Sequence, residues 1–405
     1  MKKIVYLMMS GGVDSSVAAY LLTQNENYEV RGVFMKCWSL DKLRQLGFSD
    51  QLYNCTWQDD MTDASIVAGK LGIPFEVWDF QDEYANGVVE YMIGEYLLGR
   101  TPNPDVMCNS IVKFGVFYER AMALGADFVA TGHYAKIDTI PLTDSSVSNY
   151  IIFGNNRFII QANDDFKDQS YFLWKIDKER LQKALMPIGD IENKAKVREI
   201  ALENGLITAH KKDSQGLCFV GKTSLRGMLL ERFGSKTGTI VTTQMDRVSG
   251  VKQITNKVKK EYQENGYVTL GTHEGACIYT IGQREGLGIG GGPWYVSAID
   301  ALCNIVYVKH ASSIADIDEM SCTISGINSF VGEDELLEVI ASGVTLKAQI
   351  RYNQGPVECR VVKEGGDFKV FFKTPIRAIA KGQSCVVYMY NDNIQGAILL
   401  GGIIV

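Results

Sequence analysis

Two groups of residues in this chain of 405 residues combine types and spacing that can support chemistry. The first is the run SGGVDSS, Ser10 to Ser16, which lies between an apolar, strand-like segment and a helix-like one. Its two glycines let the backbone approach a phosphate, and the serine hydroxyls and the free N–H groups of a helix start can donate hydrogen bonds to it. The run has neither the lysine of a Walker A loop nor the spacing GxGxxG. It therefore predicts a phosphate-binding loop of another kind, with a plain glycine turn capped by Asp14 as the alternative.

The second group is a pair of cysteines that lie far apart in the sequence. In TPNPDVMCN, two prolines fix a rigid turn and place Asp105 and Cys108 one helical turn apart at a predicted helix start. A thiol at that place has its thiolate favoured by the helix N-terminus. Cys218 lies between glycines in DSQGLCFVG, which suits a mobile loop with a reactive thiol. From the residues alone, burial of each cysteine as a small apolar side chain and a capping role for Asp105 remain open.

The composition, 46% hydrophobic and 22% charged residues, is that of a soluble globular protein. No apolar run approaches the roughly 20 residues that a membrane span requires, and MKKIVYLMM is expected to form a strand and not a signal peptide. Nine cysteines, an odd number without any CxxC pair, indicate reduced thiols and a cytoplasmic location. The net charge of −6 argues against a basic surface throughout, so a nucleic-acid partner would depend on local clusters such as Lys211 and Lys212.

The order of the expected elements indicates an α/β protein followed by two small β-rich domains. Residues 1 to about 135 alternate strand-like and helix-like stretches, which is typical of a parallel sheet. Residues 172–205 have apolar residues at helical spacing. Short β-rich runs follow from about residue 238, among them GTIV, CIYTIG, NIVYVKH and SCVVYMY, and the five glycines of GLGIGGGPW suggest a boundary. We expect domains at residues 1–222, 223–292 and 293–405.

The loop from Ser10 to Ser16 resembles the pyrophosphate-binding loop of the ATP pyrophosphatases, which cleave ATP between the α and β phosphates to adenylate a carbonyl oxygen. Over nearly its full length, the chain resembles one family of this superfamily, the tRNA-specific 2-thiouridylases. The matching motifs occur in the family's order: GVFMKCW, GRTPNPDVMCNSIVKFG, ATGHYAKI, KDQSYFLW, KKDSQGLCFVG, YTIGQREGLGIGG and KGQSCVVY. The resemblance implies an N-terminal catalytic domain of the adenine nucleotide hydrolase-like type.

The activity that this resemblance implies is that of a tRNA-uridine 2-sulfurtransferase with ATP and Mg²⁺ as cofactors and tRNA as a partner. The C2 oxygen of the wobble uridine would be adenylated and then replaced by sulfur, giving 2-thiouridine, AMP and pyrophosphate. Cys218 would receive the sulfur as a persulfide from a donor, either a cysteine desulfurase or a sulfur-relay protein. Cys108 would act as the nucleophile that helps to deliver it, leaving a disulfide between Cys108 and Cys218 for a reductant to open. Asp105 is implied in proton transfer and in binding the target base.

The family's binding positions carry over to this sequence one by one. The positions implied at ATP are Met8, Met9, Ser10, Gly11, Gly12, Val13, Asp14, Ser15, Met35 and Gly132. The positions implied at the target base and the rest of the tRNA are Asn103, Pro104, Asp105, His133, Lys167, Asp168, Gln169, Arg351, Tyr352 and Gln383. No protein residue is implied as a metal ligand.

Some of these positions have a physical rationale of their own. Arg351 beside Tyr352 offers a phosphate contact and a stacking surface, and Lys211 with Lys212 is expected to bind tRNA phosphates. His133 taken alone is also consistent with a hydrogen-bonded core histidine. The sequence departs from the family pattern at Met8, Cys37 and Lys381 and in an insertion at 251–268.

Three other functions stay open. Another adenylating enzyme with this loop, using ammonia or an amino group, would not require both Cys108 and Cys218. An iron–sulfur protein would use Asp105, Cys108 and Cys218 as ligands. A non-catalytic module would bind RNA in a nucleotide-dependent way without cleaving ATP to AMP.

Overall fold

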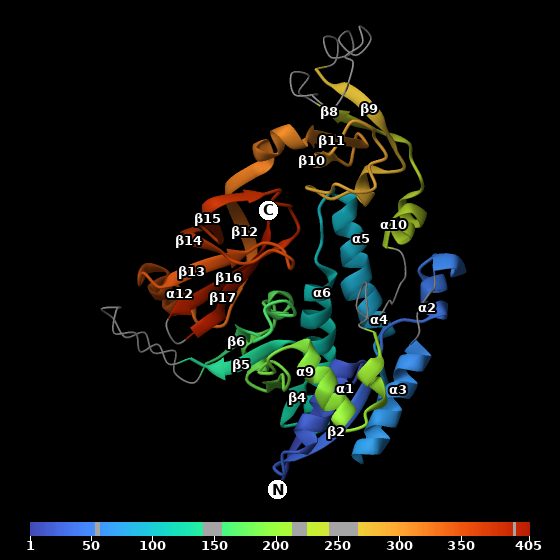
Figure 1. Cartoon of the computed structure of the whole chain (residues 1–405), viewed down its shortest axis with the longest axis vertical. Coiled ribbons are helices and arrows are strands. Elements are labelled where there is room, and N and C mark those ends of the chain that lie inside the picture. The colour runs from blue at the N-terminus through green and yellow to red at the C-terminus, as the bar shows by residue number, and fades with distance from the viewer. Residues whose placement is uncertain (53–56, 141–155, 213–224, 243–265, 392–393) are drawn as a thin grey trace.

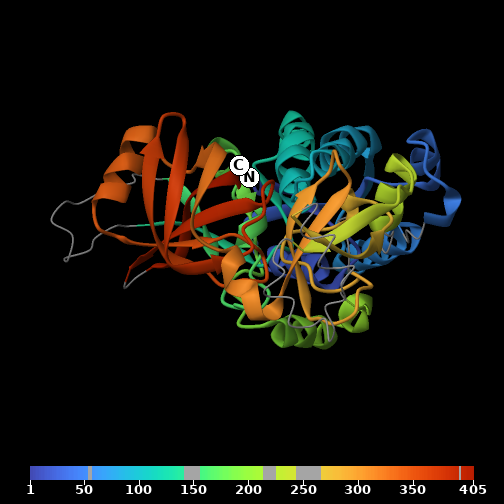
Figure 2. The same cartoon turned by 90° about the horizontal axis from the view of Figure 1, so that it is seen from above.

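The computed structural model describes three connected parts of the chain. It covers residues 1–52, 57–140, 156–212, 225–242, 266–391 and 394–405. The N-terminal part is a parallel sheet with helices, the second part lies beyond α5 (Glu90–Leu97) at one end of the molecule, and the third is a β-barrel at the side (Figure 1). The view from above shows the barrel beside the N-terminal part (Figure 2). The predicted α/β fold with two β-rich domains is therefore confirmed.

The N-terminal sheet has five strands in the order β3-β2-β1-β4-β7, and every neighbouring pair is parallel. The strands are β1 (Lys3–Met8), β2 (Tyr28–Lys36), β3 (Phe75–Asp79), β4 (Phe128–Ala130) and β7 (Ala184–Leu185). Successive side chains of a strand point to opposite faces, so Val5 and Leu7 pack on one face and Tyr6 and Met8 on the other. Because both faces are buried, the strand residues from Ile4 to Met8 are continuously apolar and do not alternate with polar residues.

Helices cover both faces of this sheet. The helices packed on the Val5 face are α1 (Val13–Thr23), α3 (Trp57–Leu71) and α9 (Lys194–Glu203). The elements packed on the Tyr6 face are α4 (Gln81–Tyr84), η2 (Ala85–Val89), α5, α6 (Pro104–Met107), η3 (Cys108–Phe117) and α7 (Tyr118–Ala123). Smaller elements nearby are α2 (Leu40–Gln45) and η1 (Asp50–Leu52). Since η3 continues α6 directly and passes into α7, the segment from Pro104 to Ala123 is a helical rod with a π-helical middle and a kink at Gly115, where the backbone is not helical.

The stretch 172–205 is less helical than its spacing predicts. It contains η4 (Ser170–Phe172), α8 (Lys178–Leu181), β7 and α9, and η5 (Ile207–His210) follows. The sequence KERLQKAL was expected to be helical throughout, but its last two residues extend and pair with β4. Sheet pairing with a segment far away in sequence thus overrides local helix propensity, and the prediction for residues 184–185 is wrong.

The second part contains a four-stranded sheet in the order β10-β11-β8-β9. Its elements are α10 (Leu225–Phe233), β8 (Gly238–Thr242), β9 (Val268–His273), η7 (Ala276–Ile278), β10 (Trp294–Asp300) and β11 (Ile305–His310). The run CIYTIG forms a turn at η7 and not the expected strand. The glycine-rich run leads directly into β10 of the same sheet, so the division from the third part falls after His310 and not at 292. Most of the insertion at 251–268 lies outside the described residues.

The third part is a barrel of six antiparallel strands in the order β12-β15-β14-β13-β16-β17, closed by pairing of β12 with β17. Its elements are η8 (Ala311–Ile317), β12 (Asp318–Ser329), α12 (Glu333–Ala341), β13 (Thr345–Gln349), β14 (Val357–Glu364), β15 (Asp367–Arg377), β16 (Ser384–Asn391) and β17 (Ile394–Ile404). A hairpin of β5 (Ala135–Thr139) and β6 (Arg157–Gln161) leaves the N-terminal domain and pairs with β17 (Figure 1). This pairing ties the barrel to the segment that follows the parallel sheet.

Candidate active site

The predicted phosphate loop, Ser10 to Ser16, joins β1 to α1 at the carboxyl edge of the parallel sheet. Gly11 has φ +74°, in the left-handed region that favours glycine. A Cβ atom at Gly11 would lie 2.1 Å from the backbone oxygen of Asp60 in α3. The loop therefore passes against the backbone of a neighbouring helix, and only glycine fits there.

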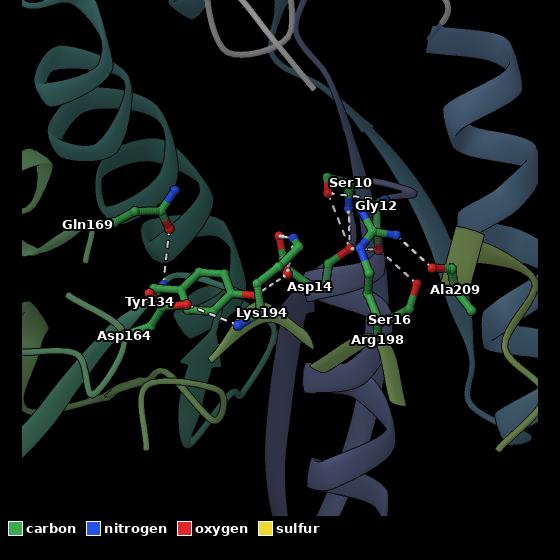
Figure 3. A network of polar contacts seen from close by, with 11 residues as sticks. Ser10, Gly12, Asp14, Ser16, Tyr134, Asp164, Gln169, Lys194, Arg198 and Ala209 are labelled. Carbon is green, nitrogen blue, oxygen red and sulfur yellow. Dashed lines mark hydrogen bonds and ion pairs between the residues drawn. The ribbon is translucent and has the colours of Figure 1, made fainter. Parts of the chain in front are cut away.

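Serine side chains hold the loop in shape. The Ser10 backbone N–H donates to Ser15 Oγ at 3.1 Å. Ser15 Oγ and Ser16 Oγ donate to the Gly12 carbonyl at 3.1 Å and 2.8 Å, as Figure 3 shows for the labelled members of this network. The buried serines thus organise the loop, which leaves the N–H groups at the first turn of α1 to bind an anion.

A second glycine contacts this loop from the segment that follows β4. A Cβ atom at Gly132 would lie 2.7 Å from the Ser15 nitrogen and 2.8 Å from the Asp14 carbonyl carbon. The structure thus brings Gly132 to the loop, and its contact with ATP stays a prediction. Four other predicted ATP residues, Met8, Met9, Val13 and Met35, have side chains buried in the two cores beneath the loop. Contact of these four with a nucleotide would have to involve their backbone atoms.

Asp14 is the centre of a polar network that the sequence did not predict (Figure 3). Lys194 Nζ lies 2.7 Å from both Asp14 carboxylate oxygens, and the Tyr134 hydroxyl donates to the same carboxylate at 2.7 Å. Lys194 is the first residue of α9, and its backbone N–H donates to Asp164 Oδ2 at 2.9 Å. An ammonium group therefore lies beside the phosphate loop, brought there from 180 residues away along the chain.

His133 links the loop region to the helix that carries Cys108. Its Nε2 lies 3.2 Å from Lys113 Nζ on η3, and its Nδ1 lies 2.8 Å from Thr131 Oγ1. An ammonium group can only donate, so Nε2 accepts and Nδ1 carries the proton of a neutral imidazole. Burial, and then the charge of Lys113, lower the pKa of His133 well below its ordinary value. His133 is therefore a neutral, fixed bridge between β4 and η3.

The predicted thiol helix begins as expected. Asn103 precedes α6, Pro104 is its first residue, and Asp105 and Cys108 lie three residues apart on one helical rod. Asp105 is half-buried, whereas Cys108 is completely buried among core residues. Cys108 is the fifth residue of the rod, beyond the first turn in which the electrostatic effect of a helix N-terminus is strongest. The structure thus confirms the spacing but removes most of the expected helix-end contribution to the thiolate.

Three models of known families match this chain in succession. They are described as a tRNA methyl transferase HUP domain at residues 2–222, a tRNA methyl transferase PRC-barrel domain at 226–310 and an aminomethyltransferase beta-barrel domain at 320–405. The tRNA-specific 2-thiouridylase MnmA of Flavobacterium johnsoniae is 39% identical over 412 residues, covering 98% of this chain and 100% of that protein. MnmA of Bacillus licheniformis is 39% identical over 400 residues, covering 97% and 93%. The chain belongs to the tRNA-specific 2-thiouridylase family.

The matched domains agree with the observed fold, because the second model ends at residue 310, where the sheet of β8 to β11 ends. The model names refer to methyl transfer, whereas these full-length relatives are named as thiouridylases. Among solved structures, the U34-tRNA thiolase NcsA from Methanococcus maripaludis has a TM-score of 0.33 and 19% identity over 57% of this chain and 66% of that chain. A similarity of that size carries no argument here.

In this thiouridylase family member, the barrel holds the segment that precedes the thiol helix. Gln383 Nε2 donates to the Thr101 and Pro102 carbonyls, each at 3.1 Å, and the Thr101 N–H donates to the Lys381 carbonyl at 2.8 Å. Asn103 is buried, and its side chain hydrogen-bonds the Tyr171 hydroxyl. Two residues predicted to contact tRNA, Gln383 and Asn103, therefore have structural contacts around the start of the helix.

The predicted RNA pair on the barrel also has intramolecular partners. One terminal nitrogen of Arg351 donates to the Ile281 carbonyl at 2.9 Å and to the Ala378 carbonyl at 2.6 Å. Burial lowers the pKa of Arg351, although the guanidinium stays charged. Arg351 thus joins the second domain to the barrel, which differs from the predicted free phosphate contact.

Tyr352 lies close to the start of the thiol helix. Its ring packs on Phe172 with a centroid distance of 4.5 Å. Burial raises the pKa of the Tyr352 hydroxyl, and the nearby carboxylates of Asp168, Asp164 and Asp105 raise it further. The structure therefore brings Tyr352, Asp105 and the turn that contains Asp164 and Asp168 into one region.

The segment 167–169 is held in place by hydrogen bonds, of which those of Asp168 and Gln169 involve their side chains. Asp168 is buried and accepts hydrogen bonds from the Ala162 N–H at 3.0 Å and from Ser170 Oγ at 2.7 Å. Burial raises the pKa of Asp168, and these hydrogen bonds only partly offset that rise. Gln169 Oε1 accepts from the Tyr134 N–H at 3.0 Å, and its own N–H donates to the Tyr134 carbonyl at 2.7 Å. Asp168 and Gln169 order the segment, in which Asp168 is buried and both Lys167 and Gln169 are partly exposed.

Two further expectations concern the segment around Cys218. Lys211 Nζ lies 2.7 Å from Asp60 Oδ1 and 2.5 Å from Asp63 Oδ2 on α3. Lys211 thus pairs with two carboxylates, whereas Lys212 is exposed, and the phosphate contacts expected of both stay a prediction. Cys218 lies outside the described residues, so its distance from Cys108 is not tested. Within the described ranges, no three His, Cys, Asp or Glu side chains are arranged to hold a metal ion, and no helix is long and apolar enough to cross a membrane.

Proposed function

We propose that this chain is a tRNA 2-thiouridylase that adenylates the C2 oxygen of the wobble uridine and replaces it with sulfur. The observation that carries the proposal is the contact of two sites on one edge of the sheet. Gly132 contacts the phosphate loop at Ser15, and the adjacent His133 contacts Lys113 on the helix of Cys108. A loop suited to pyrophosphate and a helix with a carboxylate and a thiol are thereby adjacent in a member of the thiouridylase family.

The loop fits the triphosphate of ATP. A side chain at Gly11 would clash with the Asp60 backbone, and one at Gly132 with the backbone of Asp14 and Ser15. Glycine at both positions thus keeps the loop in the shape in which the N–H groups of α1 can bind phosphate oxygens. Lys194, which lies beside Asp14, adds a positive charge at the same place. Mg²⁺ that is bound mainly by phosphates takes one or two protein carboxylates, and Asp14 would offer one. Bound Mg²⁺ would neutralise charge that develops on pyrophosphate as it leaves.

The proposed sulfur transfer uses two thiols. Attack of the uridine C2 oxygen on the α-phosphate of ATP releases pyrophosphate and leaves C2 activated. The terminal sulfur of a Cys218 persulfide then bonds to C2, and AMP leaves with the original oxygen. The Cys108 thiolate attacks Cys218 Sγ, which frees the C2 sulfur and leaves a disulfide that a dithiol reductant opens. Asp105, one helical turn before Cys108, is proposed to bind the base and to transfer the proton.

Complete burial of Cys108 requires movement around the start of its helix before this step. Gln383 and Lys381 hold that region from the barrel, so we propose that tRNA binding to the barrel is coupled to exposure of Cys108. Within the described part of the chain, Cys108, Cys277, Cys303, Cys322, Cys359 and Cys385 form no disulfide, which supports a proposed site of action in the reducing cytoplasm. The sulfur donor is proposed to be a persulfide-carrying protein.

Labelled persulfide sulfur tests the division of labour between the thiols. Cys218→Ser should not accept the label, whereas Cys108→Ser should accept it and fail to pass it to tRNA. Cys303→Ser is the matched control, because Cys303 is an exposed thiol on the second domain. Equal loading of all three variants, or thiolation of tRNA by the Cys108→Ser, Cys218→Ser double variant, would overturn the sulfur relay.

A further inference from the structure

Phe166 is an aromatic side chain that packs on nothing in the described part of the chain. Its relative exposure is 96%, against 0–8% for the aromatic residues of the cores. Both faces of this phenyl ring are therefore open to a binding partner, and the ring stands on an ordered segment of the chain. The adjacent residues are polar, with Asp165 and Lys167 on its two sides.

The turn that carries Phe166 is held rigidly. The buried Asp164 carboxylate accepts from the Phe166 N–H at 3.1 Å and from the Lys194 N–H at 2.9 Å. The Lys167 N–H donates to the Asp164 carbonyl at 3.0 Å, which closes the turn. Buried Asp168 fixes the other end. Because the backbone is ordered in advance, binding through this ring costs little conformational entropy.

The turn also lies beside the candidate active site. Asp164 accepts from Lys194, whose ammonium pairs with Asp14 of the phosphate loop. The carboxylates of Asp164 and Asp168 act on the Tyr352 hydroxyl together with that of Asp105. The labelled Asp164, Lys194 and Asp14 side chains lie next to one another in Figure 3. A molecule bound at Asp105 and the loop therefore has this turn at its border.

We propose that Phe166 stacks on an unpaired nucleobase of the bound tRNA, next to the base that is modified. This inference rests on the proposed function. One flat aromatic ring between polar residues suits the π-face of a base, which every nucleotide presents whatever its sequence. A protein partner would instead be expected to use an aromatic anchor within a wider apolar patch. Lys167 next to the ring can contact the phosphate of the same nucleotide.

Equilibrium binding of unmodified tRNA to the full chain tests the proposal. Phe166→Ala should raise the Kd about 5- to 150-fold, which corresponds to the roughly 1–3 kcal/mol of one stacked base. The slope of log Kd against log salt should stay unchanged, because stacking releases no counterions, whereas Lys167→Ala should reduce it. Phe166→Trp should restore affinity, and its added indole fluorescence should be quenched by tRNA.

Leu302→Ala is the matched control, because Leu302 is 98% exposed and lies on the second domain, so its removal should leave the Kd unchanged. If wild type binds tRNA and Phe166→Ala binds it equally well, the stacking proposal is wrong while the proposed function stands. Loss of sulfur-donor binding by Phe166→Ala with an unchanged Kd for tRNA would also overturn it, in favour of a protein contact. If wild type itself does not bind tRNA, the proposed function fails first.

Discussion

Replacement of Gly132 by alanine should damage ATP use without unfolding the protein. The added Cβ atom would lie 2.7 Å from the Ser15 nitrogen, so β4 and the loop must separate by about 0.7 Å to restore an ordinary contact of 3.4 Å. Both clashing partners are backbone atoms, which cannot rotate away as a side chain can. A hydrogen bond of ordinary length from that N–H to a phosphate oxygen would be lost after such a shift.

One hydrogen bond to a charged group contributes about 1.5–3 kcal/mol, so kcat/KM for ATP should fall about 10- to 150-fold. The assay is tRNA-dependent formation of AMP at varied ATP concentrations, with circular dichroism as the check on folding. Gly69→Ala is the matched control, because Gly69 lies in α3 with no atom within 4 Å of its added Cβ. That variant should keep wild-type kinetics. Wild-type AMP formation by a folded Gly132→Ala variant would refute the assignment of this loop to ATP.

Three further predictions follow from contacts that the sequence did not predict. Gln383→Leu leaves two carbonyls without their donor and should lower the free energy of unfolding, measured in urea, by about 1–3 kcal/mol. An unchanged urea midpoint would mean that Gln383 does not stabilise the fold, and only its predicted contact with tRNA would be left. Lys211→Met should lower stability but leave the salt slope of tRNA binding unchanged. Burial lowers the pKa of Lys211, but its two aspartate partners outweigh that effect and raise the pKa. The stabilisation by these ion pairs is therefore complete below about pH 10.5 and is lost as the pH rises above it. If wild type and Lys211→Met still differ in stability at higher pH, the ion-pair explanation is contradicted. The pKa of His133 is lowered by burial, so the unfolded chain binds more protons than the folded protein, and the free energy of unfolding should fall as the pH drops below about 6.5. His133→Gln should lack this part of the pH dependence. If the variant and wild type show the same dependence of stability on pH, His133 is not buried as a neutral ring.

Features encoded by neighbouring residues were predictable from the sequence. The phosphate loop, the helix after it and the spacing of Asp105 and Cys108 depend on local glycines, prolines and apolar periodicity, and the structure places all three as expected. The parallel sheet followed from strands that alternate with helices. These patterns are short-range, so one sequence contains enough information to find them.

Contacts between distant segments could not be predicted in this way. Lys194 could not be placed beside the phosphate loop from the sequence, because no local pattern states that α9 begins beside Asp14. Arg351 and Gln383 have side chains suited to RNA, yet each binds two backbone carbonyls between domains. Residue type indicates which bonds a side chain can form, but the partner is decided by tertiary packing.

The same reason explains the misplaced domain boundary. The glycine-rich run has the composition of a linker, but pairing of β11 with β8 draws the following strands into the second domain. Only the long-range register decides between a linker and a loop within one sheet. The helix expected at residues 184–185 was lost to sheet pairing in the same way.

Transfer of a labelled oxygen tests the central claim most directly. A tRNA that carries oxygen-18 at C2 of the target uridine is incubated with the full chain, ATP, Mg²⁺ and a persulfide donor, and the products are analysed by mass spectrometry. Adenylation of C2 followed by sulfur transfer predicts one thiouridine for each AMP, with the label in the phosphate of AMP. Thiouridine formed with the label in water or pyrophosphate, or AMP formed without label, would contradict the proposed chemistry.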